Sequence, residues 1–245
     1  MHPSEYKNMF EKEQTYWWYV GLHSLVYSSL CNQKINKDSV ILDAGCGTGG
    51  LIHFLSKKGY QNLEGFDFST DAINFCHKRG FENCFQQDLN TWEPNKKYDV
   101  IVSCDVLYHK NVLNDELIIQ KFKEALNPGG ILILNLPAFE ILKRQHDIIV
   151  ETKKRYTTNS IKKLCESSNL TILFITYRLP LLFGAILISK WVNKIFNKTE
   201  KSDLDTISPF TNKLLLNANL IENKLVRNKI KLPFGSSVFA IIKKK

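Results

Sequence analysis

Short apolar runs alternate with amphipathic stretches through the first half of the chain. We expect the apolar runs to be buried strands, and they cover 40–44, 63–66, 84–86, 98–104 and 131–136. The stretches between them place apolar residues at helical spacing, over 51–58, 71–78 and 115–126. A turn sequence, Asn-Pro-Gly-Gly at 127–130, separates the last of these helices from the last strand. Strands that alternate with helices predict an α/β domain with a mostly parallel sheet.

The second half of the chain follows a different spacing. A helical pattern over 156–168, capped by Thr157 or Thr158, precedes a β-rich run over 170–177, and a last strand is predicted over 238–242. About sixty residues separate these two runs, far more than a hairpin needs. One domain is therefore expected, with four parts: an N-terminal helical segment (1–36), a core (37–178), an inserted helical cap (179–233), and a last strand with a basic tail (234–245).

Charge and composition narrow the function classes. The 245 residues are 44% hydrophobic, which is typical of a folded chain, and 33 Lys and Arg against 24 Asp and Glu give a net charge of +9. The lysines are spread along the chain without an arginine-rich arm, so nucleic acid is a disfavoured partner. The first residues contain no apolar run typical of a secretion signal, and we expect a cytoplasmic protein.

Six cysteines show neither a C-x-x-C pair nor a spacing typical of zinc ligands. We interpret them as free, buried thiols. The Asp, Glu and His residues also form no cluster with metal-ligand spacing, so no metal is predicted.

A glycine-rich turn lies between the first strand and the next helix. Its sequence at 41–50, ILDAGCGTGG, lets the backbone reach positive φ and leaves free amides at a helix start. Gly45, Gly47 and Gly50 also satisfy the G-x-G-x-x-G pattern of dinucleotide-binding enzymes. A nicotinamide or flavin enzyme, and a turn without a ligand, are alternatives at this point.

Acidic residues follow the next two strands. Asp67 ends the second strand, where it can accept hydrogen bonds from ribose hydroxyls, and Asp88 follows the third. The sequence CDVLYH at 104–109 leaves the carboxyl end of the fourth strand, the edge at which ligands of open α/β sheets bind.

Together these segments resemble the class I S-adenosylmethionine-dependent methyltransferases. LDAGCGTG at 42–49 is similar to the first motif of that family, Asp67 to its ribose-binding acid, Asp88-Leu89 to its adenine-edge motif, and LNPGG at 126–130 to the turn before its fifth strand. The segments 17–21, 154–157 and 232–237 resemble a bacterial subgroup associated with glycan and small-molecule pathways. The resemblance implies a Rossmann-like sheet of seven strands in the order 3-2-1-4-5-7-6, with the last strand antiparallel.

The resemblance also implies S-adenosylmethionine as cofactor and a set of residues that bind it. Asp43, Gly45 and Gly47 would hold the methionine part, with Cys104 presenting its backbone to the same end. Asp67 would bind the ribose. The residues expected at the adenine are Phe68, Asp88 and Leu89, and those that complete the glycine turn are Cys46 and Gly49.

The methyl group of such a cofactor is already activated, so the protein mainly has to position an acceptor. A hydroxyl acceptor also needs a base with a pKa near neutrality. We predict His109, just beyond the fourth strand, as this base, with His146 second and a packing role for His109 as the alternative. The residues predicted to contact the acceptor are Trp18, Tyr108, His146, Arg155 and Tyr156.

The sequence thus predicts a methyltransferase that acts on a small molecule or a glycan or surface-polysaccharide precursor, by O-methylation. The alternatives are an NAD(P)-dependent oxidoreductase and a non-catalytic, cofactor-binding partner subunit. RNA methylation is a minor variant, because the Asn-Pro-Pro-Tyr type of motif is absent after the fourth strand.

The cap contains one amphipathic stretch, 187–198. Leu187, Trp191 and Ile195 share one face and three lysines follow the other, as in a helix that lies on an anionic membrane surface. A cap helix that turns Trp191 inward over the substrate is the alternative that we favour. The apolar run 179–188 is too short to span a bilayer, which needs about 20 apolar residues.

Overall fold

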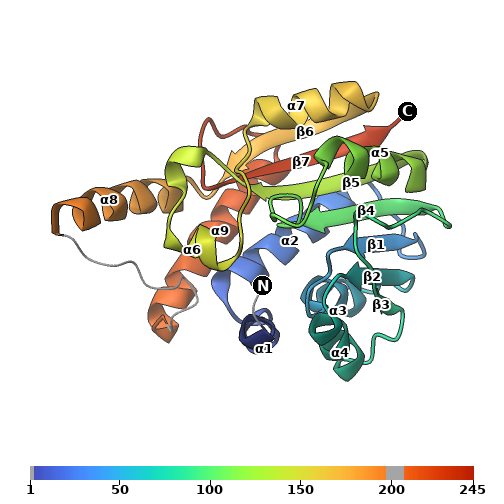
Figure 1. Cartoon of the computed structure of the whole chain (residues 1–245), viewed down its shortest axis with the longest axis horizontal. Coiled ribbons are helices and arrows are strands. Elements are labelled where there is room, and N and C mark those ends of the chain that lie inside the picture. Colours follow the sequence, from blue (N-terminus) through green and yellow to red (C-terminus); the bar gives the residue numbers. More distant parts are fainter. Residues whose placement is uncertain (1–2, 197–206) are drawn as a thin grey trace.

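Seven strands form one sheet with helices on both of its faces (Figure 1). The structure is a computed structural model that describes residues 3–196 and 207–245. The strand order is β3-β2-β1-β4-β5-β7-β6, and β7 runs antiparallel to both of its neighbours, as predicted. The strands are β1 Ile41–Ala44, β2 Leu63–Asp67, β3 Cys84–Gln86, β4 Tyr98–Cys104, β5 Leu126–Pro137, β6 Leu170–Arg178 and β7 Ser237–Lys244.

The beginning of β5 differs from the prediction. The strand begins at Leu126 rather than at 131, because Leu126 already pairs with Tyr98 of β4. The pairing then shifts register between Tyr98 and Val100, so the Asn-Pro-Gly-Gly sequence forms an irregularity within the strand rather than a turn before it.

Helices cover the sheet because each of them has one apolar face. The helices before the insertion are α1 Pro3–Lys12, α2 Trp17–Asn32, α3 Gly50–Lys57, α4 Thr70–Lys78, α5 Asp115–Ala125, α6 Gln145–Ile149 and α7 Thr158–Ser167, with a short 3-10 turn at Glu140–Leu142. Side chains of α5 and α7 pack on one face of the sheet, and those of α2, α3 and α4 pack on the other. Thr157 caps α7 by accepting the amide hydrogen of Ser160.

Two helices, α8 Pro180–Phe196 and α9 Pro209–Arg227, lie between β6 and β7, in the segment predicted as a helical cap. α9 packs along α2, where Asn223 Nδ2 donates to the carbonyl oxygen of Gly21 at 2.7 Å. α8 extends away from the body of the protein (Figure 1).

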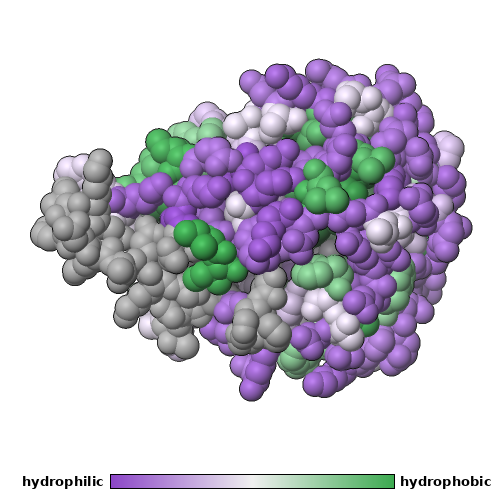
Figure 2. Space-filling model, viewed as in Figure 1, coloured by the Kyte–Doolittle hydropathy of each residue, from purple (hydrophilic) through white to green (hydrophobic). Residues whose placement is uncertain are grey.

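The position of Trp191 differs from the prediction. Its side chain is 68% exposed, so the interpretation that turned it inward is wrong. Ile186 is the buried residue among 180–191, the part of this helix whose side chains are described, and five residues of α-helix rotate Trp191 by about 140° away from it. Over the face shown in Figure 2 the surface is mostly hydrophilic with separate hydrophobic patches. Among the described helices, none combines the length and the apolar character needed to cross a membrane.

Candidate active site

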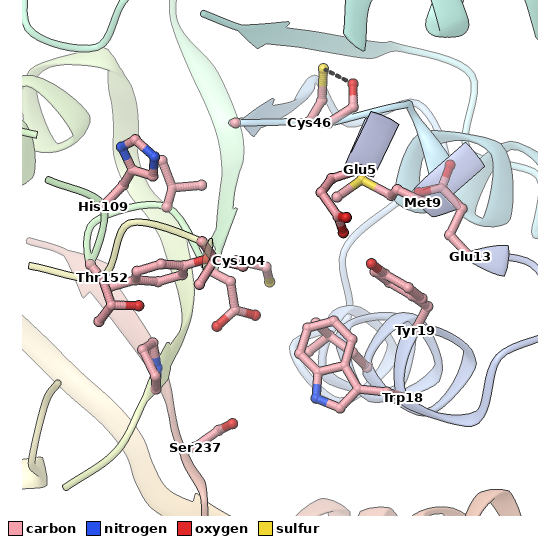
Figure 3. Close-up of a pocket in the computed structure, with 18 of the residues that line it drawn as sticks. Glu5, Met9, Glu13, Trp18, Tyr19, Cys46, Cys104, His109, Thr152 and Ser237 are labelled. Atoms are coloured by element: carbon pink, nitrogen blue, oxygen red, sulfur yellow. Dashed lines mark hydrogen bonds between the residues drawn. The ribbon is translucent and has the colours of Figure 1, made fainter. Parts of the chain in front are cut away.

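A cavity of 510 Å³ lies at the carboxyl ends of β1, β2 and β4, beneath α1 and α2 (Figure 3). The strand ends contribute Asp43, Asp67 and Cys104 to its wall. Figure 3 shows Glu5 and Met9 of α1 and Trp18 and Tyr19 of α2 on the opposite side. The N-terminal helices therefore enclose the edge of the sheet at which the sequence placed the ligand.

The glycine turn presents its backbone to this cavity. Gly45 and Gly47 have φ of +90° and +52°, and a Cβ atom on Gly45 would lie 2.2 Å from Val106 Cγ2. A Cβ atom on Gly47 would lie 2.9 Å from Met9 Sδ. The amides of Gly45 and Cys46 donate to the carbonyl oxygen of Phe66, which ties the turn to β2. Val106 thus excludes a side chain at Gly45, and the positive φ disfavours one at Gly47, so the turn favours glycine at both positions.

Asp67 is held at the end of β2 by the turn itself. Its carboxylate accepts the amide hydrogens of Gly47 at 3.1 Å and Ser69 at 3.0 Å. Burial raises the pKa of Asp67, and these hydrogen bonds oppose the rise. The other residues predicted for the adenosine, Phe68, Asp88 and Leu89, also line the cavity. The cavity near Asp67 thus combines exposed main chain of the glycine turn, a buried acid and the aromatic ring of Phe68. This combination fits a nucleoside.

Gly49, which was predicted with this group, does not line the cavity. It caps α3 with φ of +81°, and a Cβ atom there would lie 3.0 Å from Cys76 Sγ. Asp43 lies buried at the end of β1, and burial raises its pKa well above the usual value. Asp43 and Cys104 line the cavity between the glycine turn and the end of β4.

Asp105 directly follows β4 and lines the cavity. Its φ of +55° lies in the left-handed region, which Asp tolerates better than most residues. Its depth below the surface raises its pKa to about 7, although a hydrogen bond from Asn135 and the charges of Arg178 and Arg155 act in the opposite direction. A carboxyl group that titrates near neutrality can accept a proton under ordinary conditions. The segment 104–109 was predicted to lie at this edge of the sheet, but Asp105 was not among the predicted site residues. The signal available for it was an acid directly after the fourth strand.

A buried guanidinium stabilises the ionised form of this carboxylate. Arg178, the last residue of β6, is fully buried and donates through Nη1 to Asn135 Oδ1 and through Nη2 to Asn219 Oδ1, both at 3.2 Å. Burial lowers the pKa of Arg178, and the charges of Glu222 and Asp105 raise it. Asn219 and Glu222 belong to α9, so the insertion contributes to the support of the site.

His109 lines the cavity beside Phe68. Its ring centroid is 5.8 Å from that of Phe68, and its Nε2 lies 3.2 Å from Glu151 Oε2. Its Nδ1 accepts the amide hydrogen of Asn111 at 3.2 Å. Burial lowers the pKa of His109. The amide of Asn111 thus holds the histidine next to the ring predicted to contact adenine, with Glu151 close to its other ring nitrogen.

Of the residues predicted to contact the acceptor, Trp18, Tyr108 and Arg155 line the cavity. Arg155 donates through Nε and Nη2 to the two carboxylate oxygens of Asp147, at 2.8 and 3.0 Å. Burial opposes ionisation of Asp147, but this guanidinium outweighs it and lowers the pKa.

Tyr156 does not line the cavity. Its ring is buried in the core, and its hydroxyl bonds to the carbonyl oxygen of Leu107 and to the carboxylate of Asp115. The backbone of His146 lies in α6, but its side chain is outside the described part of the structure.

The contacts of α1 with the glycine turn were not predicted from the sequence. Glu13, just after this helix, is buried and accepts a hydrogen bond from Thr48 Oγ1 of the glycine turn. It pairs with Arg79 at 2.5 Å, and Arg79 also donates to the carbonyl oxygens of Thr48 and Phe10. Burial raises the pKa of Glu13 to about 7. The only signal was the helical spacing of Tyr6, Phe10 and Glu13.

Comparison with known proteins identifies a family and a fold. A family model described as "Methyltransferase domain" matches residues 26–173, which is more than half of the chain. Phosphoethanolamine N-methyltransferase of Plasmodium falciparum is 29% identical over 110 residues, which cover 43% of this chain and 41% of that protein. The tRNA U34 carboxymethyltransferase of Helicobacter acinonychis is 28% identical over 143 residues, or 54% of this chain and 52% of that protein. The chain therefore spans about half or less of these relatives.

Solved structures share the architecture over nearly the whole chain. An S-adenosylmethionine-dependent methyltransferase from Clostridium acetobutylicum has a TM-score of 0.60 at 15% identity and covers 92% of this chain and 91% of its own. The plantazolicin methyltransferase in complex with S-adenosylhomocysteine also has a TM-score of 0.60, at 17% identity, and covers 99% of this chain and 90% of its own. These matches confirm the predicted fold.

Proposed function

This chain belongs to the methyltransferase-domain family, and we propose that it transfers a methyl group from S-adenosylmethionine to a small molecule enclosed by the cavity. The observation that carries the proposal is that one cavity joins the glycine turn and Asp67 to Asp105. Its 510 Å³ is typical of small-molecule sites, which measure about 300–1,000 Å³. The family match disfavours the NAD(P)-dependent oxidoreductase that the glycine pattern also allowed.

The residues at the nucleoside end fit the cofactor predicted from the sequence. When bound, S-adenosylmethionine supplies a methyl group activated by a sulfonium. The backbone of Gly45 and Gly47 would lie against its methionine part, and the Asp67 carboxylate would accept hydrogen bonds from the ribose hydroxyls. Phe68 and Leu89 provide apolar surface for the adenine. Family membership and the solved neighbours support this assignment.

Asp105 is our proposed general base. It accepts the acceptor's proton as the methyl group is transferred, and Asn135 and Arg178 hold the carboxylate ionised near neutral pH. General bases contribute about 10²- to 10⁴-fold in rate. We prefer Asp105 to His109, the base predicted from the sequence, because the His109 ring lies against Phe68. His109 would then orient Phe68 against the adenine.

A hydroxyl is the acceptor atom that most needs such a base, and O-methylation of a glycan or other small-molecule precursor remains our proposal. An amine is the second candidate. The rings of Trp18 and Tyr19 and the carboxylates of Glu5 and Asp105 line the cavity, and aromatic faces with nearby anions stabilise an ammonium group. A nucleic-acid acceptor is disfavoured, because the lysines are spread along the chain without an arginine-rich arm.

Mass spectrometry of a small-molecule extract tests the function directly. The extract is incubated with the full chain and S-adenosylmethionine whose methyl group is isotopically labelled, with the Asp105→Asn variant as the matched control. We expect one labelled small molecule, and fragmentation then distinguishes a methyl group on oxygen from one on nitrogen. A chain that binds S-adenosylhomocysteine but labels nothing in any extract would support the partner-subunit alternative. In a parallel incubation with total RNA, label in the RNA and in no small molecule would contradict the small-molecule assignment.

We also propose that α8 rests on the inner face of a membrane. Leu181, Ile188 and Trp191 form an exposed apolar stripe on this helix, with exposed fractions of 75%, 65% and 68%. The net charge of +9 favours an anionic surface. Of the predicted segment 187–198, residues 197 and 198 lie outside the described residues, as do the side chains of 192–196. The proposal therefore depends on 181–191.

A further inference from the structure

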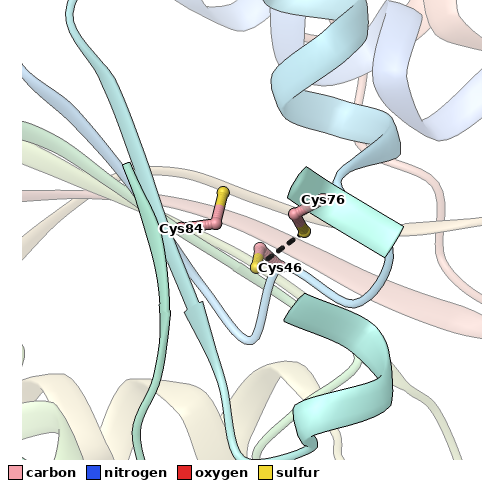
Figure 4. A group of neighbouring side chains, drawn as sticks. All are labelled: Cys46, Cys76 and Cys84. Atoms are coloured by element: carbon pink, nitrogen blue, oxygen red, sulfur yellow. Dashed lines mark hydrogen bonds between the residues drawn. The ribbon is translucent and has the colours of Figure 1, made fainter. Parts of the chain in front are cut away.

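Three cysteine side chains meet behind the glycine turn (Figure 4). Cys46 lies within the turn, Cys76 comes from α4, and Cys84 is the first residue of β3. Their exposed fractions are 6%, 0% and 2%, and their sulfur atoms all lie within 4.8 Å of one another. Three soft ligand atoms thus lie close together in a buried part of the protein.

The spacing of these sulfur atoms suits one metal ion. Four-coordinate zinc has Zn–S bonds of about 2.3 Å, which place neighbouring sulfur atoms about 3.8 Å apart. Cys46 Sγ and Cys76 Sγ lie 3.9 Å apart. That separation is too long for a disulfide bond, in which the sulfur atoms lie about 2.05 Å apart. Thiolate ligands select ions such as zinc over magnesium or calcium.

A main-chain oxygen lies at the distance expected of a fourth ligand. The carbonyl oxygen of Gly47 is 3.4 Å from Cys76 Sγ and 3.7 Å from Cys46 Sγ. In a tetrahedral zinc site with bonds of about 2.3 Å to sulfur and 2.1 Å to oxygen, the sulfur-to-oxygen distance is about 3.6 Å. The Gly47 oxygen and the sulfur atoms of Cys46 and Cys76 therefore have the spacing of three corners of a tetrahedral site, and Cys84 Sγ lies within 4.8 Å of both sulfur atoms.

We propose that Cys46, Cys76 and Cys84, with the Gly47 carbonyl oxygen, bind one divalent ion of the zinc group. Each S–H bond that breaks leaves its electron pair to a metal–sulfur bond and its proton to the solvent, without any change in oxidation state. Because Cys46 and Gly47 belong to the glycine turn, the bound ion joins this turn to α4 and β3. The ion and the cofactor should then influence each other's affinity.

Cadmium is a suitable probe, because cadmium bound to thiolates absorbs in the ultraviolet. The full chain, reduced and freed of metal, is titrated with Cd²⁺ alone. We expect the absorption to saturate at one ion per chain, and excess Zn²⁺ to remove it. The Cys84→Ser and Cys76→Ser variants should bind Cd²⁺ at least 100-fold more weakly. Two matched controls, Cys165→Ser in the core and Cys31→Ser at the surface, should bind like the parent chain.

The proposal fails if the absorption does not saturate at one equivalent, or if Cys84→Ser retains it. A second measurement uses only the parent chain, so its result does not depend on whether a variant folds. Bound Zn²⁺ should protect Cys46, Cys76 and Cys84 from alkylation at least tenfold, while Cys31 reacts equally with and without the ion. Equal labelling of the three cysteines with and without Zn²⁺ would overturn the site.

The coupling to the cofactor rests on the proposed function, whereas metal binding does not. Calorimetry with S-adenosylhomocysteine should show at least a threefold difference in affinity between the zinc-loaded and metal-free chain. An unchanged affinity would overturn the coupling. Absence of S-adenosylhomocysteine binding in both forms would instead contradict the proposed function.

Discussion

The side-chain amide of Asn135 donates to Asp105 Oδ2 at 2.8 Å, while its carbonyl oxygen accepts from Arg178 Nη1 at 3.2 Å. One residue in the middle of the sheet thus connects the carboxylate in the cavity with a buried guanidinium from β6. Burial alone would keep Asp105 protonated, whereas the hydrogen bond from Asn135 and the charge of Arg178 lower its pKa. The pKa of about 7 is the balance of these effects.

Replacement of Asp105 tests the proposed base. Asp105→Asn keeps the shape but cannot accept a proton, so we expect turnover to fall about 10²- to 10⁴-fold. The affinity for S-adenosylhomocysteine, measured by calorimetry, should change by less than about threefold, because a neutral isostere disturbs the nucleoside end little. The matched control is His109→Gln, which should lose less turnover than Asp105→Asn. The reverse order would restore His109 as the base.

The pH dependence of kcat/KM tests the role of Asn135. Asp105 acts as a base only when ionised, so kcat/KM should rise with pH and level off above about 7. Asn135→Leu removes a donor that stabilises the ionised carboxylate, and the inflection should therefore move to higher pH. Circular dichroism checks that the variant is folded. An inflection that stays in place would show that Asn135 does not tune Asp105.

Most of the fold could be predicted because its signals are local. The apolar runs of β1 and β4 and the turn residues after each helix are read directly from neighbouring positions. The beginning of β5 could not be predicted, because the pairing of Leu126 with Tyr98 depends on a neighbouring strand. The three cysteines are similarly hidden, since they come from segments that only the folded chain brings together.

The site residues within contiguous motifs could likewise be predicted, whereas those placed by contacts between distant segments could not. The glycine turn and Asp67 are contiguous motifs, and the structure places both at the cavity. The segment 104–109 was also predicted to lie at the cavity. The backbone conformation of the segment, however, determines which of its side chains reach which part of the site. The left-handed turn at Asp105 accompanies its approach to Asn135, whereas His109 lies beside Phe68. Spacing along the chain does not contain that information.

Asp67 should control cofactor affinity. Asp67→Asn weakens the charge-assisted hydrogen bonds expected to the ribose, each worth about 1.5–3 kcal/mol, so S-adenosylhomocysteine should bind about 10- to 100-fold more weakly. Asp88→Asn is the matched control and should have a smaller effect, because Asp88 is exposed. Calorimetry gives both affinities. Equal binding by the parent chain and Asp67→Asn would remove Asp67 from the nucleoside site.

The exposed stripe of α8 predicts binding to anionic vesicles. The chain should sediment with vesicles rich in phosphatidylglycerol and less with neutral ones, and added salt should weaken the binding. Leu181→Ser combined with Trp191→Ser should reduce the bound fraction at least severalfold. Phe210→Ser, on α9 and 78% exposed, is the matched control and should leave it unchanged. Binding that the double variant retains would contradict a membrane role for α8.

The burial of Glu13 predicts that the contact between α1 and the glycine turn stabilises the protein less as the pH rises. Its folded pKa of about 7 lies above its usual 4.5, so its contribution to stability is complete below about 4.5 and is lost as pH rises through about 7. This shift corresponds to about 3 kcal/mol. Glu13→Gln stays neutral and can still accept from Thr48, so its free energy of unfolding in urea should fall less between about pH 5 and 8 than that of the parent chain. If the free energies of unfolding of the two proteins change with pH in parallel, Glu13 is already ionised below neutrality. The charge of Arg79 would then outweigh the effect of burial on the pKa of Glu13.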